Sequence, residues 1–179
     1  MNTTPLTADD RVEITELFGH YAWAADTGDL DGYVATFTDD GVFDGIMGYY
    51  DGPDRLRQLA AQVHAGPRSR GIQHWVNNSV FKGNHDRCVV RSMAFAPRRI
   101  ENEHTIVFVG YYIDTCRRVD GSWLFEIRRF RPWVGEVLDG GRPWETGADD
   151  GGWITRPAEA VENPNDTERS EQSARLESD

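Results

Sequence analysis

The sequence contains few cysteines: there are two in 179 residues, Cys88 and Cys116. This number is too small for the disulfide framework of a small secreted protein. Each cysteine lies in a strand-like run of residues. We therefore expect both to be reduced and buried as small apolar side chains.

Long hydrophobic runs are also absent. No stretch approaches the ~18–20 apolar residues that a membrane-spanning helix needs, so we expect no membrane partner. The first residues, MNTTPLTADD, have neither the basic segment nor the apolar segment of a secretory signal. These absences predict a cytoplasmic protein.

Positive charge is scarce, because 19 Lys and Arg residues stand against 30 Asp and Glu residues, a net charge of −11. Binding to nucleic acid needs clustered basic side chains, so we expect no nucleic-acid partner. Much of the acid lies in residues 139–179, a polar segment with few large apolar groups. We expect one domain in residues 1–138 and an acidic tail, partly docked through Trp144 and Trp153 and then disordered.

Several catalytic and ligand-binding motifs are missing from the sequence. No H-x-H, C-x-x-C or H-E-x-x-H cluster indicates a metal site. No glycine-rich phosphate loop follows a strand, and no G-x-S-x-G nucleophile elbow is present. We therefore expect neither a metal nor another cofactor.

The sequence does contain helical periodicity in its first third. Residues 7–28 predict a helix that begins at Thr7, with Asp10 completing a capping box, and ends at Gly28. The next expected elements are a short helix after Asp29, a turn at 38–41, a short hairpin at 42–53 and a helix from Pro53.

From residue 71 the period changes to two. Four strands are predicted, at 71–81, 87–96, 104–119 and 122–134. Helices followed by long strands are typical of an α+β domain, here a curved, mostly antiparallel sheet with three N-terminal helices on one face. In the first strand, alternation places His74 inward and exposes Trp75 and Phe81 on the outer face. Such an exposed face favours a homodimer or homotrimer.

The order of these elements resembles the SnoaL-like family of the nuclear transport factor 2-like superfamily. The resemblance covers residues 7–135. It is carried by a helix ending YAWAADTGDLD, the FTDDGVF segment that follows, and a late DGSWLFEIRR strand. It implies a cone-shaped α+β fold.

Within the superfamily the chain is most similar to scytalone dehydratase, bile acid 7α-dehydratase and lindane dehydrochlorinase. Those enzymes carry an acid in a D-x-x-D arrangement and a histidine early in a strand, which match Asp26 and His74 here. The resemblance also implies a role for Tyr21 and for an arginine, matched best by Arg128, with Arg129 one register step away. These two arginines alternate across a strand, so one should face inward.

Other positions depart from these relatives. The second pocket histidine of scytalone dehydratase falls on Pro97 or Arg98, and its serine and asparagine fall on Gly110 and Tyr112. The lysine of the dehydrochlorinases is absent as well. The scytalone substrate itself is therefore not expected.

The chemistry of the pair follows from the two residue types. Asp26 lies at the edge of an apolar helix stripe, where a buried carboxylate needs a partner, and His74 is the natural one. The carboxylate would fix the imidazole tautomer and support the charge that forms when histidine takes a proton. Taken singly, Asp26 could be an ordinary helix-end acid and His74 a core histidine.

Other residues are candidates for assisting roles. Tyr21 or Arg128 would stabilise a developing enolate or a leaving group by hydrogen bonding. Candidates for substrate contacts are Tyr49, Tyr50, Tyr112, Asp114 and Arg129.

We expect a cofactor-independent lyase, acting by a dehydratase or dehydrohalogenase type of β-elimination. Its substrate would be a small hydrophobic cyclic molecule such as a steroid, terpenoid or polyketide. Two alternatives stay open. One is an isomerase or cyclase that uses the same base. The other is a non-catalytic module, either ligand-binding or resembling the small subunit of a ring-hydroxylating dioxygenase.

Overall fold

The computed structural model describes residues 4–66 and 69–133, and its first helix is α1, Ala8–Thr27. The Thr7 hydroxyl accepts a hydrogen bond from the Asp10 backbone N–H at 3.1 Å, and the Asp10 carboxylate accepts one from the Thr7 backbone N–H at 2.8 Å. Gly28 ends the helix in the left-handed conformation, with φ of 76°. The predicted capping box and the predicted helix end are both confirmed.

Two further helices follow. Helix α2, Leu30–Ala35, begins after Asp29, whose carboxylate accepts a hydrogen bond from the Gly32 N–H at 2.9 Å. Helix α3, Gly52–Ala65, has a proline in its first turn and buries Leu56. None of the helices in the described part of the chain is long and apolar enough to cross a membrane.

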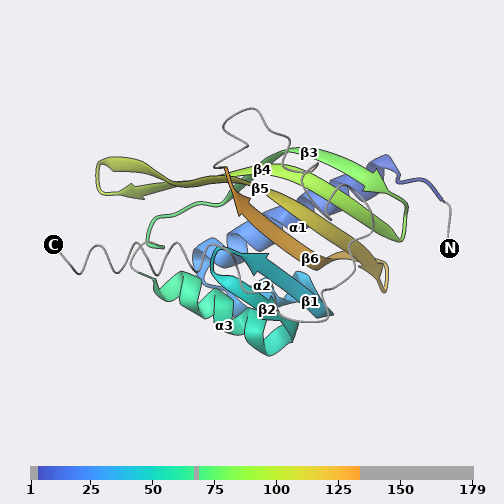
Figure 1. Cartoon of the computed structure of the whole chain (residues 1–179), viewed down its shortest axis with the longest axis horizontal. Helices are drawn as coiled ribbons and strands as arrows, with labels where there is room; N and C mark the ends of the chain where they lie inside the picture. The colour runs from blue at the N-terminus through green and yellow to red at the C-terminus, as the bar shows by residue number, and fades with distance from the viewer. Residues whose placement is uncertain (1–3, 67–68, 134–179) are drawn as a thin grey trace.

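Six strands form one curved sheet, which α1 crosses on one side (Figure 1). The strands are β1 (Phe37–Gly45), β2 (Gly48–Asp51), β3 (Trp75–Gly83), β4 (Arg87–Ile100), β5 (Glu103–Val119) and β6 (Ser122–Pro132). Their order is β2-β1-β6-β5-β4-β3, and only the β1–β6 pairing is parallel among these neighbours. The predicted α+β fold is confirmed.

The turn expected at residues 38–41 is wrong. These residues belong to β1, whose pairing with β6 jumps from Phe37–Phe125 to Val42–Ile127. A bulge inside a strand and a turn between elements share the same polar, glycine-containing composition. Only the partner strand distinguishes them.

The face assigned to Phe81 is also wrong. Strand β3 begins at Trp75, and its pairing with β4 shifts between Asn77 and Val80, where Asn78 has φ of 55°. The bulge reverses the alternation, so Phe81 packs against the core and Val80 is 65% exposed. Trp75 lies before the bulge and is 49% exposed, as predicted.

The sheet is buried on both faces at its centre. On the concave face, the ring of Phe18 from α1 stacks on Phe125, with centroids 5.7 Å apart. On the opposite face lies a smaller apolar cluster made of Val42, Val89, Ile113 and Ile127. Cys88 and Cys116 are free and fully buried, as the sequence predicts, and they lie opposite each other on β4 and β5.

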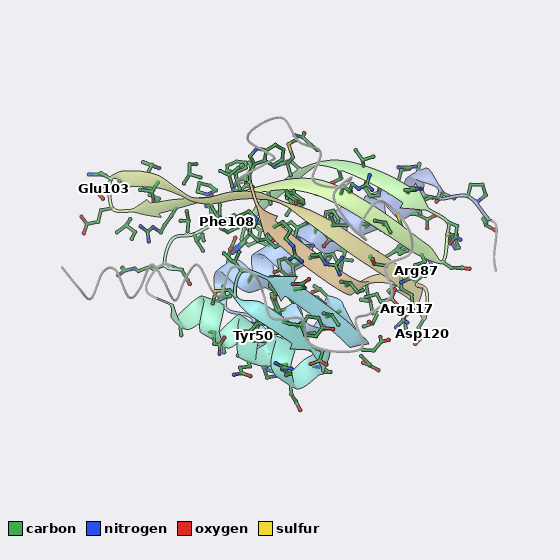
Figure 2. All side chains as sticks on the ribbon, viewed as in Figure 1. Tyr50, Arg87, Glu103, Phe108, Arg117 and Asp120 are labelled. Atoms are coloured by element: carbon green, nitrogen blue, oxygen red, sulfur yellow. The ribbon has the colours of Figure 1, made fainter. Side chains whose placement is uncertain are left out.

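Strands β4 and β5 continue beyond the other strands as a hairpin, which we call the arm (residues 97–108; Figure 1). In Figure 2, Glu103 lies at the tip of the arm and Phe108 near its base. The predicted boundary at residue 138, the tail at 139–179 and its residues Trp144 and Trp153 lie outside the described residues.

Candidate active site

Asp26 lies in the last turn of α1, beside the buried face of the helix. That face runs through Ile14, Phe18 and Tyr21. Asp26 lies one turn after Ala22, in the row of residues next to that buried face. The side chain of Asp26 is 18% exposed. The carboxylate therefore lies at the border between the core and the surface.

Asp26 holds His74 at two points. One carboxylate oxygen, Oδ1, lies 2.5 Å from Nδ1 of the imidazole, and the other accepts a hydrogen bond from the His74 backbone N–H at 2.8 Å. The histidine side chain is 12% exposed, and its ring centroid lies 5.5 Å from that of Phe108. Both the backbone and the ring of His74 are thus fixed by one carboxylate.

The arm fixes the segment just before His74. The Gln73 backbone N–H donates to the Pro97 carbonyl at 2.9 Å, and the Arg99 N–H donates to the Gly71 carbonyl at 3.0 Å. Gly71 has φ of 75°, and a Cβ built on it would lie 2.1 Å from the Arg99 carbonyl oxygen. This approach requires glycine at residue 71.

The contacts of Nδ1 determine which nitrogen of neutral His74 carries the proton. A carboxylate only accepts hydrogen bonds, so the nitrogen facing Asp26 must be the protonated one. The other nitrogen, Nε2, then carries a lone pair, and within residues 4–66 and 69–133 no group hydrogen-bonds to it. The pair is therefore arranged for Nε2 to accept a proton.

Asp26 and His74 line a cleft of about 540 Å³ between α1 and the β3 edge of the sheet. This volume lies within the range of roughly 300–1,000 Å³ that is usual for small-molecule sites. The walls combine aromatic and aliphatic side chains, such as Phe18 and Val76, with a few polar groups.

Tyr21, one of the predicted assisting residues, lies in the core. Its hydroxyl is 3.2 Å from the hydroxyl of Tyr33, and the residue is 4% exposed. Burial and the neighbouring Tyr33 raise the pKa of Tyr21 well above its ordinary value, so the hydroxyl stays protonated. Tyr21 is not among the described residues that line the cleft.

Arg128 faces the concave side of the sheet and is fully buried. Its Nη1 donates to Asp114 at 2.9 Å, and its guanidinium carbon lies 3.8 Å from the ring centroid of Tyr112 and 4.1 Å from that of Tyr21. Burial alone would lower the pKa of Arg128, but Asp114 and the tyrosines raise it, so the charge is kept. Burial raises the pKa of Asp114 to about 7, because Arg128 offsets only part of the desolvation cost.

Aromatic contacts connect this buried group to His74. The ring centroid of Phe130 lies 5.2 Å from that of Tyr112 and 5.0 Å from that of Phe108, which in turn contacts His74. Tyr112, Asp114 and Arg128 therefore support the concave face behind the histidine, and none of them is among the described residues of the cleft wall.

The remaining predicted contacts lie elsewhere. Arg129 is on the opposite face of the sheet from Arg128, where its Nε donates to Asp44 at 2.9 Å. Tyr49 packs against the apolar cluster of that same outer face. The Tyr50 hydroxyl lies 3.0 Å from the Gln62 side-chain oxygen of α3. The structure does not bring these three to the described wall of the cleft.

A second buried carboxylate, Asp10, serves the fold. Besides Thr7, it accepts hydrogen bonds from Arg118 at 2.5 Å, from His85 at 3.0 Å and from Trp123 at 3.2 Å. Burial opposes ionisation, but the hydrogen bonds from Thr7, His85 and Trp123 hold the pKa of Asp10 well below its usual range. Asp10 thus ties α1 to the β3–β4 turn and to the two last strands.

Two residues of the cleft wall, Trp23 and Gln73, were not among the residues selected from the sequence. A signal for each was present. Trp23 precedes Asp26 by one helical turn, and Gln73 is the neighbour of His74. In the part of the chain that the structure describes, no group of three or more His, Cys, Asp or Glu side chains could hold a metal ion.

Comparisons with known proteins agree on the family and the fold. The family model described as a SnoaL-like domain matches residues 6–129. A protein of unknown function with a cystatin-like fold from Nostoc punctiforme is 29% identical, with a TM-score of 0.65 over 71% of this chain and 93% of that one. No curated protein sequence matches the chain significantly.

Two more distant structures share the fold. A nuclear transport factor 2-like protein with a cystatin-like fold from Novosphingobium aromaticivorans is 22% identical, with a TM-score of 0.66 over 73% of this chain and 86% of that one. LinA is 20% identical, with a TM-score of 0.58 over 71% of this chain and 91% of that one.

Proposed function

This chain belongs to the SnoaL-like family, as its sequence predicts, and from that premise we propose that it is a cofactor-independent lyase. Members of the family are commonly enzymes, including dehydratases, a dehydrochlorinase and cyclases. In the proposed reaction, His74 is the base, Asp26 positions it, and a small hydrophobic cyclic substrate loses water. The substrate would be a steroid, terpenoid or polyketide in type.

The observation that carries the proposal is the two-point contact between Asp26 and His74 at the wall of a cleft. In the neutral imidazole, this contact keeps the proton on Nδ1 and leaves the Nε2 lone pair available to a bound molecule. When Nε2 takes a proton, the adjacent carboxylate stabilises the imidazolium. General base catalysis of this kind contributes about 10²–10⁴-fold to a rate.

The proposed elimination is balanced within the cleft. Nε2 of His74 removes the proton from a carbon next to a carbonyl group, and the C–H electron pair forms the new C=C bond. The C–O bond to the neighbouring hydroxyl breaks, and the imidazolium returns its proton to the departing oxygen as water. With halide as the leaving group, the imidazolium instead loses its proton to solvent.

Tyr21 and Arg128 enter this proposal indirectly. Both are buried beneath the aromatic rings that support His74, so their predicted contact with a leaving group would require a substrate that reaches the core. We propose that they maintain the position of the concave face.

The test is turnover of a panel of cyclic β-hydroxy ketones, followed by mass spectrometry of the products. We expect loss of water, which His74→Ala and Asp26→Ala should abolish. The matched control is His20→Ala, because His20 is exposed on the same helix as Asp26. Normal turnover in the His74→Ala protein would refute the proposal.

An isomerase or cyclase is the second candidate, because the same Nε2 base could move a proton without expelling a group. Its product would have the mass of the substrate, and in D₂O it would carry solvent deuterium. A non-catalytic binding module or a dioxygenase small subunit would show no turnover with any substrate. The latter would also form a stable complex with a larger chain, whereas the predicted homodimer or homotrimer would not.

A further inference from the structure

Two tryptophans from different elements line the cleft that contains Asp26 and His74. Trp23 belongs to α1 and is 74% exposed, and Trp75 begins β3 and is 49% exposed. Large aromatic side chains usually bury most of their surface. Two exposed tryptophans in one cleft therefore mark a surface suited to covering a ligand.

Trp75 is held in place before any ligand binds. Its ring lies 5.7 Å from that of Phe95, at an interplanar angle of 32°. Its indole N–H is 3.4 Å from the side-chain oxygen of Gln73. This contact leaves the amide NH₂ of Gln73 able to donate a hydrogen bond to an oxygen in the cleft.

The charge of the described cleft wall is unfavourable for anionic ligands. Among the described residues that line it there is no lysine or arginine, and the one carboxylate is Asp26. The other polar side chains are Thr15, Gln73, His74 and Asn77, which are amides, a hydroxyl and the imidazole. An anionic ligand would meet a like charge and no cation.

We propose that the cleft selects an uncharged molecule with a planar ring system, which packs against Trp23 and Trp75 while an oxygen accepts a hydrogen bond from Gln73. This inference rests on the proposed function for its substrate site, and it narrows the substrate class. The inference predicts that carboxylated, phosphorylated and coenzyme A-linked molecules bind more weakly than uncharged ones. Trp23 and Trp75 determine specificity by stacking, which favours flat rings over puckered ones.

The test uses isothermal titration calorimetry of the full chain with three matched compounds. The compounds are 2-naphthol, its anionic analogue 2-naphthoate, and the saturated, non-planar decahydro-2-naphthol. We expect 2-naphthol to bind about tenfold more tightly than either of the others. Trp23→Leu and Trp75→Leu should each weaken its binding by about fivefold, which is the loss of one aromatic stacking contact.

Trp133→Leu is the matched control, because Trp133 lies outside this cleft and its replacement should leave the affinity unchanged. His74 is part of the cleft wall, so His74→Ala can change the absolute affinity, but it should keep the preference for 2-naphthol over the other two compounds, since that preference needs no base. Loss of turnover in that variant therefore tests the reaction separately from ligand selection.

Equal affinity for the three compounds, or unchanged affinity in both tryptophan variants, would overturn the inference. A change of oligomeric state in those variants, measured by analytical ultracentrifugation and without an effect on affinity, would assign the two tryptophans to a protein interface instead.

Discussion

Replacing Asp26 with asparagine keeps the shape of the side chain and removes its charge. The geometry predicts which atom of the pair can then no longer act as the base. The carboxylate offers two acceptors to two N–H groups, the backbone of His74 and its Nδ1. An amide offers one acceptor and one donor. The backbone N–H cannot change, so the amide oxygen should stay on it and the NH₂ group should face the imidazole.

The imidazole must then change its tautomer. Nδ1 becomes the acceptor, the proton moves to Nε2, and the nitrogen facing the cleft can no longer take a proton from a substrate. We expect kcat to fall by about 10²–10⁴-fold, the contribution of a general base, or about 2.7–5.4 kcal/mol in activation free energy. The free energy of unfolding should change by only about 1–2 kcal/mol, because both hydrogen bonds persist in neutral form.

Two measurements check this prediction: steady-state turnover of a substrate found in the screen of hydroxy ketones, and long-range ¹H–¹⁵N spectra that report the histidine tautomers. Asp29→Asn is the matched control, since asparagine caps a helix as well as aspartate does and Asp29 only caps α2. An Asp26→Asn protein that keeps its rate, or that keeps the proton on Nδ1 of His74, would refute the reasoning.

Three stability predictions follow from buried or strained positions. In urea titrations, Gly71→Ala should lose more stability than the ~1 kcal/mol expected of Gly121→Ala, since both have positive φ and only Gly71 meets a backbone oxygen. Asp10→Ala should lower the free energy of unfolding by about 1–3 kcal/mol, because it leaves the buried Trp123 indole N–H without its acceptor, whereas Glu13→Gln at a more exposed side chain should lower it little. With the pKa of Asp114 raised to about 7, the folded state keeps a proton that the unfolded chain releases above about pH 4. The melting temperature should therefore fall as the pH rises through that window. In the Asp114→Asn protein, the melting temperature should change less over the same window.

The ends of α1 were predictable because their signals are local. Thr7 and Asp10 are three residues apart, and Gly28 adopts a conformation that glycine tolerates best. The phase of β3 was not predictable by counting alternate residues. One bulge at Asn78 moves every later side chain of the strand to the opposite face of the sheet. The only sequence signal for this bulge is a pair of asparagines.

The sequence alone does not determine which of the two arginines of β6 faces the core. Alternation indicates that Arg128 and Arg129 face opposite sides but does not say which side is the core. That depends on β6 pairing in parallel with β1, which places Asp44 beside Arg129, and on Asp114 lying opposite Arg128. The encounter of Asp26 with His74 was expected from a family resemblance, because no local pattern joins positions 48 residues apart.

The two aspartates of the concave side differ in ways that suit different tasks. Asp26 accepts two N–H groups and keeps contact with solvent, so its charge is compensated and it can respond to a proton arriving on His74. Asp114 is fully buried, with one hydrogen bond from Arg128, and burial favours its neutral form. A positioning carboxylate must stay charged as its histidine gains a proton, which explains why the end of an apolar helix face, rather than its centre, carries that acid.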